Sequence, residues 1–333
     1  MIHVTEEQNT SKVKNIIEQK KFGRGGYYCY NFDVIAEVKD GVYKLRNILS
    51  GIRKTSFYIV YLDKEPMVIA PVEINKNTAM ILGSAEYFDF VDIFYRSNAK
   101  YSILKECFIH LLIYLKQMGM STLHWNYLPS DSFSKDYLSL FNVTENCEVD
   151  NVAILFKNYK EYIKSLSKST RQNLRTAENR IKREGHDYRL LNNFNSPLDS
   201  NVVKQCEDVY YHRQKDNYGK NALNLFMIKT INYGTQLIKK QKGNLMVLMI
   251  DNKVVAFMFG FINDQKESFE VPKLAINDDY AFYSPGMILV NKTIEYFDLN
   301  SDINKLDLCR GTESYKLKMG GHIYKTYNYT VEL

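Results

Sequence analysis

The chain has 333 residues, enough for two domains, and its 45% hydrophobic and 25% charged residues are typical of a globular protein. Its formal net charge of +6 permits an anionic ligand such as CoA but is too small for a dedicated DNA-binding face. No stretch approaches the roughly 18 apolar residues of a membrane span, and the first residues do not resemble a signal peptide, so we expect a cytoplasmic protein. Five cysteines without paired spacing argue against a disulfide framework or a zinc site, so no metal is expected.

The first half alternates in the manner of strands and carries one long helix. Residues 1 to 43 give no readable pattern, and a helix candidate follows Tyr43. The apolar pattern then predicts strands over 57–62, 67–74, 79–82 and 123–127 and a helix over 103–118.

Two carboxylates of this half are candidates for substrate binding. Asp89 and Asp92 lie three residues apart in an aromatic-rich segment. They could present carboxylates to substrate hydroxyls or amines, or they could form the turn at a strand end. The sequence leaves both interpretations open.

A basic segment at 168–184 opens the second half. Arg171 and Arg175 are four residues apart, so on a helix they share one face. Such a stripe could contact a substrate phosphate, or it could simply be a solvated helix face.

The remaining elements follow in a definite order. A short strand at 186–193 precedes helices at 202–213 and 223–240, and apolar strands at 245–250 and 254–261 come next. The strand expected over 268–275 contains Pro272, which cannot donate to a ladder, so it should be bulged or splayed there.

A helix start follows that strand. Ser284 is suited to an N-cap, Pro285 to the first helical position, and Gly286 leaves the first turn open. A pyrophosphate could bind the N–H groups of Gly286 and Met287, where the helix dipole favours negative charge. The alternative is an ordinary capped helix, which would run to about Leu299.

The chain closes with a strand at 305–308, a short helix at 313–318 and a strand at 324–331. From 186 onward this order resembles the GNAT acyltransferase fold, and the first half resembles a second GNAT-like half without such a helix start. We therefore expect an α+β protein of two tandem GNAT-like domains, each a mostly antiparallel sheet flanked by helices. The expected boundaries are 1–157 and 158–333, with one acyl-CoA site in the C-terminal domain.

Sequence motifs narrow the resemblance. The run from Asp307 through Arg310 to Tyr315 and Lys316 is similar to the signature of the tandem-GNAT group that includes CelD-like proteins and Fem-type peptidyltransferases. Weaker similarities lie at the Arg171 helix start, at Tyr211-His212-Arg213, and at Gly83 followed by Asp89 and Asp92.

The resemblance implies roles for particular residues. Acyl-CoA would lie along the splayed strand and the helix start after it, contacting Leu274, Ala275, Ser284, Gly286 and Met287. Substrate-binding candidates are Asp89, Asp92, Arg171, Arg175, His212, Arg213, Arg310 and Lys316.

The implied chemistry is attack of an amine on a thioester, which requires a base, an oxyanion donor and protonation of the leaving thiolate. Asp307 and Glu270 are the base candidates, with Asp307 slightly favoured, although either carboxylate could be structural. Tyr283 and Tyr315 could protonate the sulfur, and a backbone N–H near Leu274 could bind the oxyanion.

Three functions are compatible with these features. The first is an N-acyltransferase that moves an acyl group from acyl-CoA to the amino group of a sugar, nucleotide-linked and used in cell-surface polysaccharide synthesis. The second is a Fem-type aminoacyl-tRNA-dependent transferase, although no inserted coiled-coil arm is visible. The third is a non-catalytic binding protein with the same fold.

Overall fold

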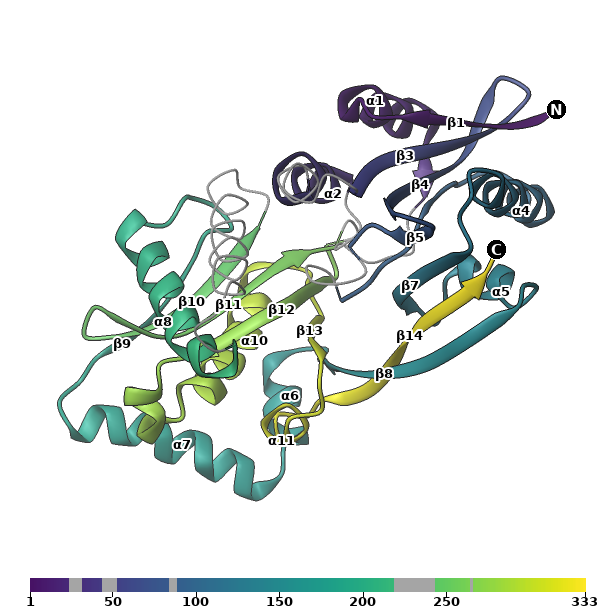
Figure 1. Ribbon diagram of the computed structural model, residues 1–333. Helices are drawn as coiled ribbons and strands as arrows, with labels where there is room; N and C mark the ends of the chain where they lie inside the picture. The colour runs from purple at the N-terminus through teal and green to yellow at the C-terminus, as the bar shows by residue number, and fades with distance from the viewer. Residues whose placement is uncertain (24–31, 44–52, 84–88, 219–242, 264–265) are drawn as a thin grey trace. The chain divides into compact units, whose positions relative to one another are not determined.

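The structure is a computed structural model that describes residues 1–23, 32–43, 53–83, 89–218, 243–263 and 266–333 (Figure 1). The chain forms two compact units. The first consists of Met1–Val149 together with Lys325–Leu333, and the second is Asp150–Tyr324. The chain passes between them within strand β8 (Val143–Leu155) and again within β14 (His322–Glu332). The helix expected over 223–240 lies outside the described residues, and so do residues 44–52, where the helix candidate after Tyr43 was expected.

The first unit is built on a mixed sheet. Its strand order is β1-β3-β4-β5-β7-β14, and only β5 and β7 are parallel in this series. Its strands are β1 (Ile2–Glu7), β2 (Phe22–Gly23), β3 (Arg53–Leu62), β4 (Glu65–Asn75), β5 (Thr78–Ile81), β6 (Phe94–Arg96) and β7 (Thr122–Pro129). Its helices are α1 (Thr10–Lys20), α2 (Phe32–Val38), the π-helix η2 (Lys39–Tyr43), α4 (Tyr101–Gln117) and α5 (Phe133–Leu138).

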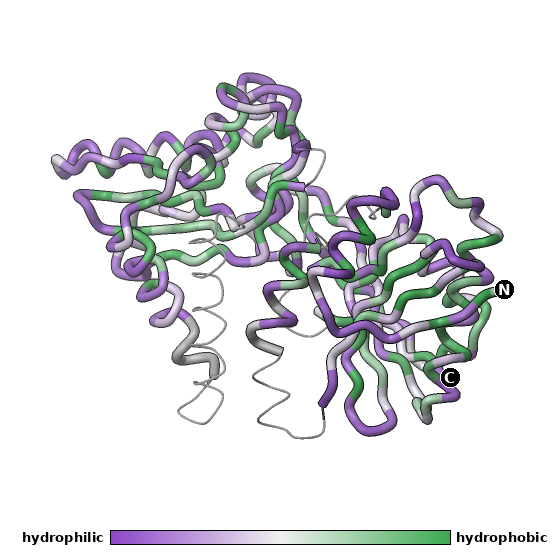
Figure 2. Tube along the Cα trace, turned by 90° about the horizontal axis from the view of Figure 1, so that it is seen from above, coloured by the Kyte–Doolittle hydropathy of each residue, from purple (hydrophilic) through white to green (hydrophobic). Residues whose placement is uncertain are grey.

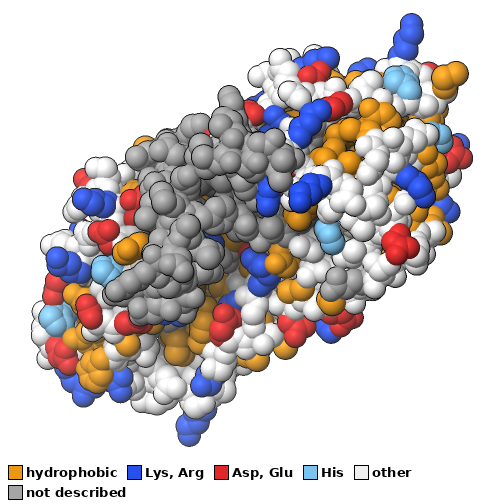
Figure 3. All heavy atoms as spheres, viewed as in Figure 1, with side chains coloured by type: hydrophobic (Ala, Val, Ile, Leu, Met, Phe, Trp, Pro, Cys, Tyr) orange, Lys and Arg blue, Asp and Glu red, His pale blue; other side chains and the backbone are white. Residues whose placement is uncertain are grey.

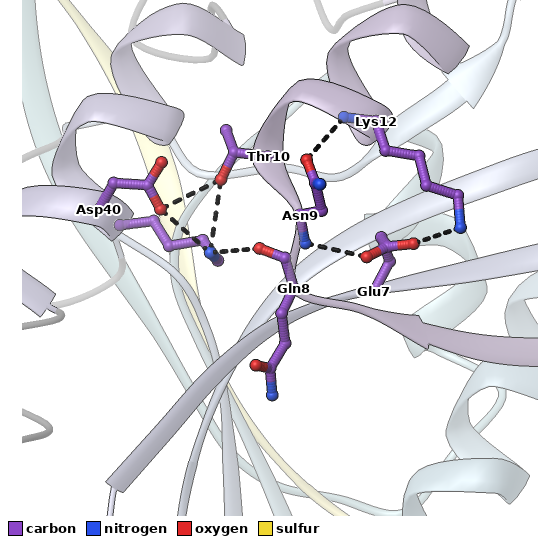
Figure 4. A network of polar contacts seen from close by, with 7 residues as sticks. Glu7, Gln8, Asn9, Thr10, Lys12 and Asp40 are labelled. Carbon is purple, nitrogen blue, oxygen red and sulfur yellow. Dashed lines mark hydrogen bonds and ion pairs between the residues drawn. The ribbon is translucent and has the colours of Figure 1, made fainter.

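The strands and long helix predicted for this half are confirmed, whereas β1 and α1 were not predicted. A polar network explains how this weakly patterned start is fixed (Figure 4). Asn9 caps α1 by accepting from the Lys12 N–H at 3.0 Å, and the buried Lys39 donates to the Gln8 carbonyl at 3.0 Å. These polar contacts add to the burial of Val13 and Ile17, which lie on one face of α1.

The C-terminal strand completes the first unit. Residues Thr326 to Glu332 of β14 pair antiparallel with β7. The last nine residues therefore fold with the first unit, whereas the division expected from sequence kept 158–333 together. Strand pairing between distant segments leaves no local signal that would reveal this.

The second unit has the strand order β8-β13-β12-β11-β10-β9, in which only β12 and β13 are parallel. Besides β8, its strands are β9 (Tyr188–Asn192), β10 (Asn244–Ile250), β11 (Lys253–Ile262), β12 (Ser268–Ile276) and β13 (Lys305–Arg310). Its helices are α6 (Tyr159–Ser165), α7 (Lys168–Arg183), α8 (Ser200–Tyr218), the 3-10 helix η3 (Asp278–Tyr283), α10 (Pro285–Asn300) and α11 (Ser314–Lys318).

Helices cover both faces of this sheet. One apolar cluster joins α6, α7 and α10 to the strands, and a second joins α8 to the other face of β10, β11 and β12. Hydrophobic residues are concentrated along the strands (Figure 2). The predicted strands and helices of this half are confirmed where the structure describes them, and β8 and α6 are additional.

None of the helices in the described ranges is both long and apolar enough to span a membrane. On the face shown in Figure 3, side chains of both charge signs are interspersed.

Candidate active site

Strands β12 and β13 separate after a short parallel pairing. Ser268, Phe269 and Glu270 pair with Lys305, Leu306 and Asp307. Beyond this point β12 continues to Ile276 with β11 as its partner. The two strands are therefore not paired with each other beyond Glu270 and Asp307, and we refer to this unpaired stretch as the opening between β12 and β13.

A β-bulge accompanies the separation and confirms the prediction made from Pro272. The register between β11 and β12 shifts between Phe259 and Phe261. Phe269 and Val271 pack with α10, but past the bulge Leu274 does so and Ala275 packs with α8. Before the bulge the odd-numbered residues of β12 face α10, and after it the even-numbered residues do. The extra residue in the bulge causes this change of face.

The close approach of β11 to this bulge requires a glycine. A Cβ on Gly260 would lie 2.1 Å from the Glu270 carbonyl oxygen, so no other residue fits without displacing the backbone. Three backbone features therefore define the opening: the glycine in β11, the bulge in β12 and the end of the pairing between β12 and β13.

Helix α10 begins directly after η3, although not by the expected cap. Ser284 has φ 49° and ψ 50°, and its side chain makes no capping hydrogen bond. Its carbonyl accepts instead from the N–H groups of Met287 at 3.1 Å and Ile288 at 3.3 Å. The expectation of free N–H groups on both Gly286 and Met287 is therefore wrong for Met287. Gly286 lies in the first turn of α10, so its N–H has no acceptor inside the helix, and Pro285 before it has no N–H.

The helix start and the strand end lie close together. A Cβ on Gly286 would be 3.2 Å from Ile276 Cγ2. The absence of a side chain at Gly286 therefore lets the first turn of α10 approach the end of β12. An elongated ligand along β12 would reach this turn.

The Tyr283 side chain is fixed by a hydrogen bond to the end of α7. Its hydroxyl donates to the Glu184 carboxylate, and this hydrogen bond raises its pKa above the ordinary value. Arg180 binds the same loop by donating to the Phe282 carbonyl at 2.9 Å. The end of α7 thereby fixes η3, the 3-10 helix that leads into α10.

Asp307 lies in a dense polar cluster. Its buried carboxylate accepts from Tyr324 Oη at 2.7 and 2.8 Å and from the Cys309 N–H at 2.9 Å. Lys305 Nζ lies 2.9 Å from the same carboxylate. Burial lowers the pKa of Lys305, but the attraction of Asp307 outweighs this and the pKa is raised.

Glu270 is the register partner of Asp307 and is also buried. Since Phe269 and Leu306 pack toward α10, both carboxylates lie on the opposite face of the sheet. Lys305 also attracts Glu270, so one lysine serves two carboxylates. The structure therefore brings the two candidate bases together on one face of the sheet.

Lys316 stabilises the turn after β13. It is buried, and its ammonium donates to the carbonyls of Leu308 at 2.9 Å, Arg310 at 2.6 Å and Gly311 at 3.2 Å. These contacts give Lys316 a structural explanation in place of the expected contact with substrate. Arg310 is the register partner of Asn151 in the pairing of β13 with β8.

Tyr315 lies on α11 and packs against the apolar core of the unit. Burial raises its pKa well above the ordinary value, while the positive charge of Arg213 acts in the opposite direction. Tyr315 is protonated at neutral pH, as tyrosine ordinarily is, and the raised pKa makes its hydroxyl a weaker acid.

His212 and Arg213 line a pocket of about 410 Å³ at the end of β12. Arg213 Nη1 lies 3.6 Å from Asp278 Oδ1, in an exposed ion pair. Ile276 also lines this pocket, so it adjoins the strand end that approaches α10.

Arg171 and Arg175 lie on α7, and they differ in their contacts. Arg171 Nη1 donates to the carbonyls of Lys164 at 3.0 Å and Leu166 at 2.5 Å, which ties α7 to the end of α6. Arg175 makes no such contact with the described residues, and both line a second cavity.

Asp89 and Asp92 lie in the first unit and are only 2% and 3% exposed. Asp92 accepts from the Ile93 N–H at 2.8 Å and from Ser134 Oγ at 2.6 Å. Their burial favours the structural interpretation over contact with a substrate. Burial raises the pKa of Asp92 to about 6, although hydrogen bonds from Ser132 and Ser134 oppose the change.

This raised pKa predicts a pH effect on stability. Folding should be progressively destabilised as pH rises from about 4 to about 6, because Asp92 then ionises in the unfolded chain while its buried carboxyl stays protonated in the folded one. The change from 3.8 to about 6 corresponds to about 3 kcal/mol. Urea unfolding at pH 4 to 8 should show Asp92→Asn gaining stability over wild type by about that amount as pH rises. A difference independent of pH would contradict this prediction.

Lys305, Tyr324 and Glu184 were not among the residues predicted from sequence. Lys305 lies two residues before Asp307 on the same strand, which places both side chains on one face and was a usable signal. Tyr324 and Glu184 reach the site from other elements, and the sequence carries no sign of those contacts.

Comparison with known proteins identifies the fold. Residues 168–317 match the sequence profile of the acetyltransferase (GNAT) domain, and no curated protein sequence matches the chain significantly. A conserved protein of unknown function from Bacteroides thetaiotaomicron superposes with a TM-score of 0.62 at 14% identity, covering 100% of both chains. FemX gives 0.61 at 10% identity over 99% of this chain and 97% of its own.

A tandem GNAT protein from the clavulanic acid biosynthesis pathway also superposes, with a TM-score of 0.54 at 7% identity over 100% of this chain and 98% of that protein. Such low identities concern the fold alone. They confirm the expected α+β architecture of tandem GNAT-like halves, and the matched profile lies wholly in the second unit.

Proposed function

We propose that the protein is an N-acyltransferase that takes its acyl group from acyl-CoA, since residues 168–317 match the model of the acetyltransferase (GNAT) domain. The observation that carries the proposal is the opening between β12 and β13 beside the first turn of α10. The pantetheine arm would extend along β12 near Leu274 and Ala275, and the pyrophosphate would lie against the Gly286 N–H.

The chemistry needs three contributions from the chain. The acceptor nitrogen attacks the thioester carbon, the C–S bond breaks, the nitrogen loses a proton and the thiolate gains one. Glu270, at the start of the opening, would take the proton from the amine. The hydroxyl of Tyr315 would supply one to the sulfur, and a backbone N–H near Leu274 would stabilise the oxyanion.

The acceptor we propose is the amino group of a nucleotide-linked sugar used in cell-surface polysaccharide synthesis. The resemblance to CelD-like proteins supports this substrate class. The pocket beside His212 and Arg213 offers both charge signs and adjoins the end of β12. A polar acceptor with a phosphate and free hydroxyls suits such a surface.

Titration calorimetry with acetyl-CoA, followed by a thiol-release assay with nucleotide-linked amino sugars, tests the proposal. We expect micromolar binding of acetyl-CoA and amine-dependent release of CoA. Absence of binding to any acyl-CoA, together with binding of aminoacyl-tRNA, would instead support the Fem-type transferase, whose resemblance rests on the same motif.

Glu270→Gln should lower kcat at least about tenfold while leaving the affinity for acetyl-CoA unchanged, because it removes the base and not the donor contacts. The control is Glu267→Gln, the same chemical change at an exposed residue just before β12. Near-normal kcat from pH 6 to 9 in Glu270→Gln would assign amine deprotonation to water.

A further inference from the structure

A second cavity lies among α6, α7 and α10, all within the second unit. Its volume is about 440 Å³. The ring of Tyr159 and the side chains of Ile163 and Leu174 give it an apolar wall. A ligand with an apolar or planar body could therefore occupy it.

Four cations surround this wall. They are Lys160 and Lys164 from α6 and Arg171 and Arg175 from α7. Within the described part of the chain, no acidic side chain pairs with any of the four. Their charge is therefore available to an anion. Because Arg171 Nη1 already donates to two backbone carbonyls, Arg175 is the arginine that can bind the anion through its planar fork.

The one acidic residue of the lining does not cancel this charge. Glu178 lies 3.5 Å from Lys292 Nζ, which also binds Glu295 at 2.8 Å. The Glu178 carboxylate is thus already balanced by a lysine that does not line the cavity.

Asn291 provides evidence for a ligand that does not depend on the four cations. It lies on α10, lines the cavity and is only 3% exposed. Its Nδ2 donates to Tyr159 Oη at 3.1 Å, but its buried Oδ1 has no hydrogen-bond partner among the described residues. A buried acceptor without a partner is costly, and a bound molecule with an N–H or O–H group would satisfy it.

We propose that this cavity is a binding site for an organic phosphate whose ring or apolar body carries a hydrogen-bond donor. The phosphate is bound by Arg175 with Lys160 and Lys164, the ring packs on Tyr159 and Leu174, and the donor group binds Asn291. The site shares no lining residue with the proposed acyl-CoA contacts, so it is a separate site.

The test uses the full chain and uridine 5′-monophosphate as probe, with uridine and inorganic phosphate as partial probes. We expect the monophosphate to bind more tightly than either part, and Arg175→Glu to weaken it at least about tenfold. Arg183→Glu is the matched control, since it reverses a charge on the same helix outside the cavity.

A second variant separates binding from folding. Asn291→Leu has a similar volume and removes the unpaired acceptor, so it should weaken the probe by roughly fivefold while leaving the thermal midpoint unchanged or higher. Equal affinity in wild type and Arg175→Glu would overturn the site.

Displacement of the probe by acetyl-CoA, or its loss in Gly286→Glu, would instead show that the cavity is part of the donor site, and the proposed separate site would then be wrong. Failure of acetyl-CoA to bind at all would leave this result unaffected, because the probe carries no acyl donor.

Discussion

Asp307→Asn should lower the free energy of unfolding by about 3 kcal/mol. The substitution leaves the Lys305 ammonium, whose side chain is 24% exposed, beside a neutral amide in a largely buried cluster. It also gives Tyr324 an amide in place of a carboxylate that accepts its hydroxyl through both oxygens. The value lies at the lower end for a broken buried pair because Lys305 keeps some contact with water.

Urea denaturation at pH 7 measures this effect, and Glu313→Gln provides the control. Glu313 also pairs with a lysine, at 3.0 Å, but its side chain is 57% exposed, so its loss should cost less than about 1 kcal/mol. If Asp307→Asn kept full stability and instead lost at least about a hundredfold in kcat, Asp307 would be the general base.

Gly286→Glu should weaken acetyl-CoA binding at least about a hundredfold, close to abolition in a calorimetric titration. The new Cβ would lie 3.2 Å from Ile276 Cγ2, and its carboxylate would project at the first turn of α10. There it would repel a pyrophosphate and take the N–H that the pyrophosphate needs.

Leu299→Glu is the control for the effect of adding one negative charge to α10. Leu299 lies on the same helix, near its other end, and is 75% exposed, so the added charge should leave donor affinity unchanged. Circular dichroism of both variants establishes that they are folded. Normal acetyl-CoA affinity in a folded Gly286→Glu protein would move the phosphate site away from this turn.

Local patterns predicted the elements that carry the proposed donor site. Pro272 predicted the bulge, and the Ser284-Pro285-Gly286 run predicted the start of α10, because proline restricts its own backbone wherever it occurs and glycine leaves room where the backbone is crowded. The sequence misjudged what Ser284 does there, since a left-handed backbone at the cap position replaced the expected side-chain contact.

The side-chain contacts of the site could not be predicted in the same way. Asp307 looked like a base from its motif, but its partner Tyr324 lies 17 residues away on another strand. The contacts that make Lys316 structural depend on a turn whose carbonyls converge only after folding. A motif gives residue types and spacing, whereas the choice between catalysis and support depends on which donors surround each carboxylate.

The two crossings within β8 and β14 make the second unit an insertion within the first, and this constrains folding during synthesis. Residues 150–324 leave the ribosome before the strand that completes the β7 edge, so the inserted unit can acquire its core while the earlier unit still has an open strand. The first part of the chain to be made is thus the last to be finished. A nascent chain that stalls before Lys325 would expose the unpaired edge of β7, a site where strands from other chains can add.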